Sequence, residues 1–139
     1  MSETISNISY KELLDTATRI AVQAKFDGLT KTQIENVIGS LYMVDDPRDA
    51  LLISQLFAHR QAKRLRGGYK TMAMISRILN DLYVRNFDRQ RASELLDLVK
   101  WVYESVENVR LPTIDVDKLT FDELMNILRG QILRGQIHA

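Results

Sequence analysis

The residues best suited to chemistry in this 139-residue sequence are a concentrated group of cations near its middle. Residues 59–91 contain nine Lys and Arg against Asp81 and Asp88, a local net charge of +7 in a chain whose total is +1. Clustered guanidinium groups bind phosphate oxygens through paired, charge-assisted hydrogen bonds. We therefore expect a nucleic-acid-binding surface formed by Arg60, Lys63, Arg64 and Arg66, with Lys70 and Arg77 as secondary contributors.

The spacing within this segment favours a common surface. The first three of these cations stand at i, i+3 and i+4, which places them on one face of a helix. Gly67 and Gly68 follow, and they are expected to turn the chain sharply and to leave backbone N–H groups accessible to an anion. Tyr69 provides a ring that can stack on an unpaired base. The alternative is a solvated helix face whose cations interact with the negative end of the helix dipole.

Patterns typical of enzymes are absent from the sequence. There is no Cys, which excludes thiolate chemistry, disulfides and cysteine-ligated metals. His59 and His138 have no partner at the spacing of a metal-binding or nucleophilic motif. Asp46 precedes Pro47 and is predicted to cap a helix rather than to bind a metal. We therefore expect no enzyme activity, no metal site and no cofactor.

The elements that must position the cations are predicted to be helices. Apolar residues recur at helical spacing, and no segment alternates as a strand would. Helix starts are predicted at three capping boxes, at Asp46-Pro47, near Tyr69 and at Asp88. The boxes are Ser9–Glu12, Thr30–Gln33 and Thr120–Glu123. The sequence thus predicts one all-α domain over residues 1–139, a compact bundle of five to six helices with its core over about 9–109, a C-terminal helix over about 120–134 and a frayed tail.

The sequence carries no sign of a membrane protein. No apolar run approaches the roughly 20 residues that a bilayer-spanning helix needs. The first nine residues lack the basic start and the apolar stretch of a secretory signal. We expect a cytoplasmic protein with no membrane partner.

The helix predicted after Asp88 is apolar around more than half a turn. Its core side is defined by Leu95, Val99, Val102 and Val106, whereas Leu98 and Trp101 point partly away from that side. Two interpretations stay open. The helix has a wide buried face, or Leu98 and Trp101 form a contact patch for another subunit.

A DNA-binding regulator is a further alternative. The helix predicted over Thr30–Leu41 could act as the recognition helix of a helix-turn-helix. It offers only Lys31, Gln33, Glu35 and Asn36 to base edges, and its density of cations is low. A plain core-packing helix is the competing interpretation.

Three stretches of the sequence together resemble the small helical subunit of type III CRISPR effector complexes. Leu29-Thr30-Lys31-Thr32-Gln33-Ile34 is similar to the start of the family's second helix. The arginine-rich stretch Arg60–Arg66 lies at about the distance of the family's basic helix, and Glu94–Tyr103 resembles its late acidic and apolar helix. The likeness spans most of residues 9–109. The sequence differs at Glu35, where the family usually has a basic residue.

This resemblance implies a non-catalytic RNA-binding assembly subunit of an antiviral ribonucleoprotein. Several copies would associate end to end in the inner filament, beside the guide RNA and its target RNA. By matching position, the cations implied to follow phosphates are Arg60, Lys63, Arg64 and Arg66. The acidic parts of the chain would then contact neighbouring copies or other subunits. The alternatives from other classes are a helical protein–protein adaptor and a small DNA-binding regulator.

Overall fold

The structure, a computed structural model, describes residues 8–133, which form six α-helices and one short 3₁₀ helix and contain no strand. The predicted all-α bundle of five to six helices is confirmed. The predicted fraying of the tail falls on residues 134–139, which lie outside the described part of the chain. The helices are α2 (Tyr10–Asp27), α3 (Lys31–Ser40), α4 (Asp49–Arg64), α5 (Tyr69–Val84), α6 (Arg89–Val106), η1 (Val116–Lys118) and α7 (Phe121–Leu133).

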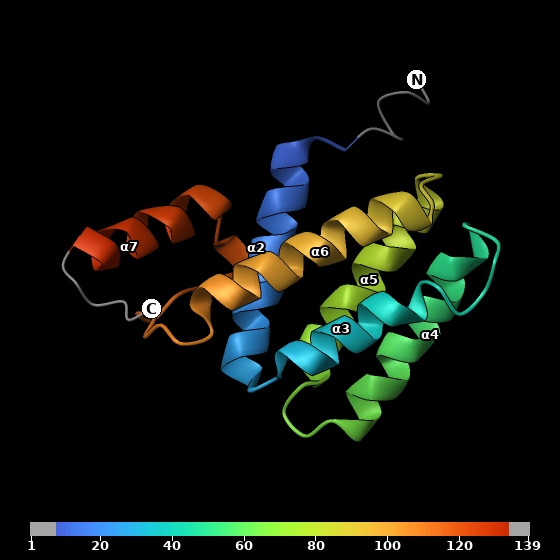
Figure 1. The fold of residues 1–139 in the computed structure, drawn as a ribbon, viewed down its shortest axis with the longest axis horizontal. Coiled ribbons are helices and arrows are strands. Elements are labelled where there is room, and N and C mark those ends of the chain that lie inside the picture. Colours follow the sequence, from blue (N-terminus) through green and yellow to red (C-terminus); the bar gives the residue numbers. More distant parts are fainter. Residues whose placement is uncertain (1–7, 134–139) are drawn as a thin grey trace.

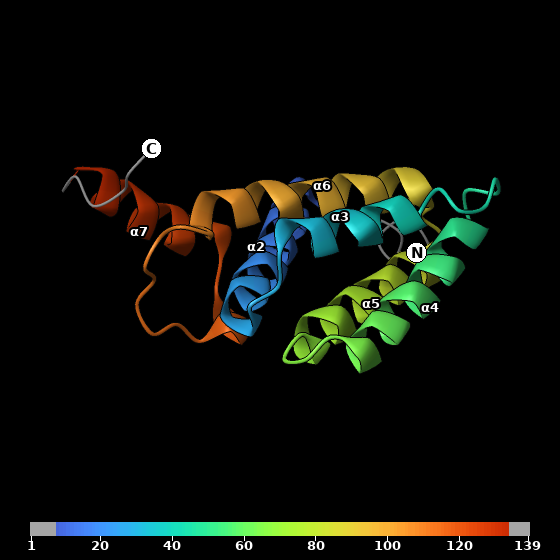
Figure 2. The ribbon, with the colours of Figure 1, turned by 60° about the horizontal axis from the view of Figure 1, so that its bottom comes forward.

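The bundle is elongated, with different helix pairs at its two ends (Figures 1 and 2). Helix α6 crosses α2 at a steep angle, and α3 lies beside α6. Helices α4 and α5 form an antiparallel hairpin at one end, whereas α7 lies at the opposite end (Figure 1). The α4–α5 hairpin is therefore well separated from the C-terminal helix.

The helix starts follow the local signals of the sequence. Ser9 accepts a hydrogen bond from the Glu12 backbone N–H at 3.1 Å, and the Glu12 carboxylate accepts one from the Ser9 N–H at 3.2 Å. The boxes that begin with Thr30 and Thr120 have the same reciprocal bonds. All three predicted capping boxes are confirmed. Asp88 also caps α6, because its carboxylate accepts from the Gln90 N–H at 3.1 Å.

The start of α4 differs from its predicted place. The Asp46 carboxylate does cap the chain here, since it accepts hydrogen bonds from the N–H groups of Arg48 and Asp49, both at 2.8 Å. The predicted first helical residue, Pro47, instead lies in a turn, and the α-helix begins at Asp49. One carboxylate satisfies two N–H groups of this turn, so the regular helix starts two residues later.

The core draws apolar side chains from all six helices, as the helical spacing predicted. Tyr103 is also buried, and its hydroxyl donates to the carbonyl of Leu29 at 2.6 Å. Burial raises the pKa of this hydroxyl. No helix within residues 8–133 is long and apolar enough to span a bilayer. The largest fully buried side chains include Ile20, Ile34, Leu51, Met72, Ile75, Leu79, Leu82, Leu95, Leu96 and Leu124.

A carboxylate of α2 holds the start of α7. The Asp15 side chain, only 18% exposed, accepts a hydrogen bond from the Phe121 backbone N–H at 2.8 Å. Burial raises the pKa of Asp15, but the bond from Phe121 and the nearby Lys11 outweigh burial, so this pKa lies below its usual 3.8. The negative charge also lies at the positive end of the α7 dipole. Asp15 thus stabilises the docking of α7 while it is ionised.

We expect Asp15→Asn to lower the free energy of unfolding by about 1 kcal/mol at neutral pH. Because the folded-state pKa of Asp15 is depressed, its contribution is complete above the unfolded-state pKa and is lost as pH falls through the folded-state value. The difference between wild type and variant should therefore shrink below about pH 4. Urea unfolding of both proteins at neutral and acidic pH measures this difference in the free energy of unfolding. A difference that grows on acidification would contradict this role.

Candidate nucleic-acid interface

The predicted cations are brought together by a tight turn between α4 and α5. Gly67 adopts a φ of +78°, which disfavours any other residue. A Cβ on Gly68 would lie 2.7 Å from the Leu29 side chain, so the turn packs closely on the connection between α2 and α3. Gly68 is buried, and its N–H donates to the carbonyl of Leu65 at 3.3 Å. The expectation of an accessible N–H is therefore wrong for Gly68, because its N–H is buried and is hydrogen-bonded within the turn.

Asp27, at the end of α2, holds the start of α5 in place. Its carboxylate accepts hydrogen bonds from the backbone N–H of Thr71 at 3.1 Å and from the Thr71 hydroxyl at 2.6 Å. It also accepts one from the Gln23 side chain at 2.8 Å. The N-terminus of α5 is thus occupied by a carboxylate of the chain itself. Sequence reasoning missed this residue because Asp27 and Thr71 stand 44 positions apart.

All six predicted nucleic-acid-binding cations are exposed. Within residues 8–133 none of them forms an ion pair or a side-chain hydrogen bond, so no carboxylate neutralises them. The three on α4 fall within an arc of roughly 100° around that helix, and the two on α5 are seven residues apart on one face. We call the first five the basic tip: Arg60, Lys63, Arg64, Arg66 and Lys70. Arg77 lies two turns farther along α5.

Other arginines of the basic segment serve the fold. The Arg89 guanidinium donates to the carbonyls of Val44 at 2.9 Å and Asp45 at 3.2 Å. Arg91 pairs with Glu94 at 2.9 Å and lies over the ring of Phe87. The local charge of +7 therefore overstates the charge that is free to bind a partner.

The helix dipole stabilises a cation at the end of a helix and destabilises one at its start, so the cations of the basic tip differ in how well they suit their positions. Lys63 and Arg64 lie in the last turn of α4, where the negative end of the dipole stabilises a cation by about 0.3–1 kcal/mol. Lys70 lies in the first turn of α5, where the dipole disfavours a cation. The solvated-face interpretation explains the first two positions and does not explain Lys70.

A hollow of about 520 Å³ opens between α3 and α4 beside the basic tip. Arg60 and Arg64 line it from α4, and Asn36 and Gly39 line it from α3. The remaining walls are formed by Ser40, Met43, Phe57, Gln61 and Leu65. Two guanidinium groups without a partner in the described chain thus border a cavity with both amide and apolar walls.

Helix α3 packs as a structural helix. Lys31 pairs with Glu104 of α6 at 3.0 Å, and Glu35 pairs with Lys100 of α6, also at 3.0 Å. Gln33 belongs to the capping box, which leaves only Asn36 of the four proposed base-reading residues without a partner in the described chain. The arrangement gives no support to a recognition helix.

The two residues of the predicted subunit contact, Leu98 and Trp101, differ in exposure. Leu98 is 9% exposed, whereas Trp101 is 66% exposed. Both line an apolar hollow of about 300 Å³ between α2, α6 and α7, with Tyr10, Phe121 and Met125. The wide buried face is therefore correct for Leu98, and Trp101 stays available for contact with another molecule.

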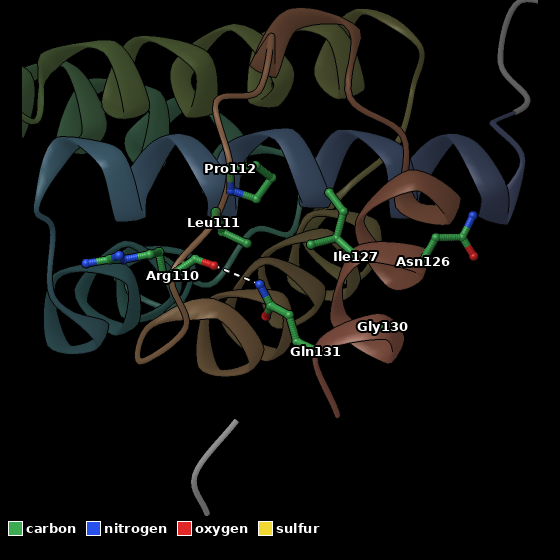
Figure 3. Close-up of a pocket in the computed structure, with 7 residues that line it drawn as sticks. All are labelled: Arg110, Leu111, Pro112, Asn126, Ile127, Gly130 and Gln131. Carbon is green, nitrogen blue, oxygen red and sulfur yellow. Dashed lines mark hydrogen bonds between the residues drawn. The ribbon is translucent and has the colours of Figure 1, made fainter. Parts of the chain in front are cut away.

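Another hollow, of about 750 Å³, lies between α7 and the chain that follows α6 (Figure 3). The Gln131 amide donates to the carbonyl of Arg110 at 2.8 Å, while the Arg110 side chain points away from Gln131. Among the described residues that line this cavity, Arg110 is the only titratable one.

No group of three or more His, Asp or Glu side chains within residues 8–133 is placed to hold a metal ion. Comparisons of the chain with models of protein families, with curated proteins and with solved structures find no match. The exposed cations of the basic tip, with the hollow beside them, are therefore the candidate binding feature of the described chain.

Proposed function

We propose that this chain is a non-catalytic RNA-binding assembly subunit of a cytoplasmic ribonucleoprotein, and that its basic tip binds the phosphate backbone of a single strand. One observation carries the proposal: the five cations of the tip are exposed and have no partner within residues 8–133, whereas Arg48 and Arg89 bind backbone carbonyls. Binding through backbone charge would not read sequence. The resemblance to the small subunit of type III CRISPR effectors favours guide RNA and target RNA as the strands, in antiviral defence.

Assembly would use the opposite end of the molecule. Trp101 is an exposed aromatic residue beside an apolar hollow, which is a common feature of protein contacts. Residues 92–127, which contain it, carry three cations and eight anions, and three of these anions, Glu94, Glu104 and Asp122, form ion pairs with cations of this chain. This acidic region would associate with another subunit or with the basic region of a second copy.

Arg64→Glu tests the proposal. Fluorescence anisotropy with a labelled oligouridine RNA should show wild-type binding that weakens as salt rises, because each phosphate contact releases counterions. Reversing the Arg64 charge should weaken binding by at least about tenfold at low salt, since a charge-assisted hydrogen bond contributes about 1.5–3 kcal/mol. The circular dichroism spectrum should not change, because this side chain has no partner within the described residues.

Lys118→Glu is the matched control. Lys118 is exposed, carries the same charge and lies in η1, which packs on α2 and, within the described chain, not on the α4–α5 hairpin. This variant should bind nearly as wild type. If both variants lose affinity equally, net charge rather than the basic tip determines binding. If the wild type does not bind RNA at low salt, the alternative of a helical protein–protein adaptor is favoured.

A further inference from the structure

The hollow between α3 and α4 has polar groups that the fold does not use. Arg60 and Arg64 border it, and neither has a carboxylate partner among the residues that the structure describes. The side-chain amides of Asn36 and Gln61 also face no hydrogen-bond partner within residues 8–133. Two cations and two amides, each with free hydrogen-bonding capacity, thus surround one cavity. This combination matches a ligand that carries both an anion and a polar edge.

Apolar side chains form another part of the lining. Phe57 is half-buried against the core, and Met43 is 63% exposed. An exposed methionine beside an aromatic residue provides an adaptable apolar surface. Flat apolar ligands such as nucleobases bind on surfaces of this kind.

Gly39 lines the hollow without a side chain. It lies within α3, where glycine costs about 1 kcal/mol relative to alanine. Its φ is not positive, and a Cβ built on it would meet nothing within 4 Å. Neither the backbone conformation nor packing within the described chain requires glycine here. The missing side chain therefore leaves space that another molecule can fill.

We propose that this hollow holds one unpaired nucleotide of the bound strand, with its phosphate on Arg60 and Arg64 and its base against Phe57 and Met43. The amides of Asn36 and Gln61 then lie near the polar edge of the base. Only an unpaired base can enter, because a paired base has its edge and faces occupied in the duplex. This inference rests on the proposed function and adds to it a preference for single strands that contain bases.

Gly39→Phe tests the inference by filling the hollow. Its affinity for labelled oligouridine RNA should fall about tenfold, which is the typical loss of one base-stacking contact. Its salt dependence should stay near that of wild type, because both arginines remain. An abasic strand of the same length should bind wild type and Gly39→Phe almost equally. Thr113→Phe, which adds the same ring to an exposed position between α6 and η1, outside the lining of the hollow, is the matched control and should bind as wild type.

Met43→Ala provides a second test that does not depend on how Gly39→Phe folds. It removes an exposed side chain, and it should weaken oligouridine binding severalfold without changing binding of the abasic strand. If neither variant differs from Thr113→Phe while the wild type binds in a salt-dependent manner, the nucleotide site is refuted and the proposed function remains. If the wild type binds neither strand at low salt, both proposals are refuted.

Discussion

Replacing Arg89 by alanine is expected to lower the free energy of unfolding by about 3 kcal/mol, which is a large effect for one surface side chain. Its guanidinium donates to the carbonyls of Leu41, Val44 and Asp45, at 3.4, 2.9 and 3.2 Å, and lies over the ring of Tyr42. These bonds satisfy carbonyl groups where α3 ends and join residues 41–45 to the start of α6. Hydrogen bonds to a charged group contribute about 1.5–3 kcal/mol each when buried and less when solvated.

Two neighbouring variants make this result specific. Gln90→Ala removes an exposed side chain next to Arg89 and should change stability by no more than about 0.5 kcal/mol. Arg89→Lys retains the charge but not the planar fork that reaches three carbonyls, so it should recover less than half of the loss. Urea unfolding followed by circular dichroism measures the free energy of unfolding of Arg89→Ala, Gln90→Ala and Arg89→Lys. A loss below about 1 kcal/mol for Arg89→Ala would show that the carbonyls are satisfied by water instead.

We expect Asp27→Ala to lower the free energy of unfolding by about 3 kcal/mol. The change removes the acceptor for three hydrogen bonds and leaves the hydroxyl of Thr71, which is fully buried, without a partner. It also removes a negative charge from the positive end of the α5 dipole. Because this carboxylate fixes the start of α5 against α2, its loss should loosen the turn that carries the basic tip.

A double-mutant cycle with Thr71→Val isolates the contact. If Asp27 acts mainly through Thr71, the two substitutions together should cost clearly less than the sum of the single ones. Asp27→Asn retains an acceptor oxygen, so it should lower the free energy of unfolding less than Asp27→Ala does. Additive effects would mean that Asp27 stabilises the fold by another route.

Local signals allowed most of the fold to be predicted from the sequence. A capping box acts within four residues, so Ser9, Thr30 and Thr120 identified helix starts without any knowledge of the tertiary structure. The helical spacing of apolar residues likewise depends only on neighbouring turns. The start of α4 was misplaced because one carboxylate, Asp46, caps a turn before the helix becomes regular.

The role of each charged residue was harder to predict, because it depends on partners that are distant in the sequence. Arg48 donates to the carbonyls of Tyr83 and Phe87, both at 2.9 Å, and Glu35 pairs with Lys100. No local pattern distinguishes these residues from the free cations of the basic tip. A count of charges along the chain therefore located the exposed cations but overstated how many of them lack a partner within the described residues.

The hollow between α3 and α4 could not be predicted either. The sequence favoured phosphate binding by Arg60 and the cations that follow it, but it gave no indication that Asn36 and Gly39 lie across from Arg60 and Arg64. Helix α3 was weighed as a recognition helix on its own. In the structure it contributes one wall of a cavity whose other wall is α4.

The most direct test of the basic tip is a titration of the isotope-labelled protein with oligouridine RNA at low salt, followed by amide chemical shifts. We predict that the largest shifts fall on residues 60–70 and on the end of α3 near Gly39, and that raising the salt concentration reverses them. Shifts concentrated on α7 and around Trp101, with residues 60–70 unchanged, would contradict the assignment of nucleic-acid binding to this end of the molecule.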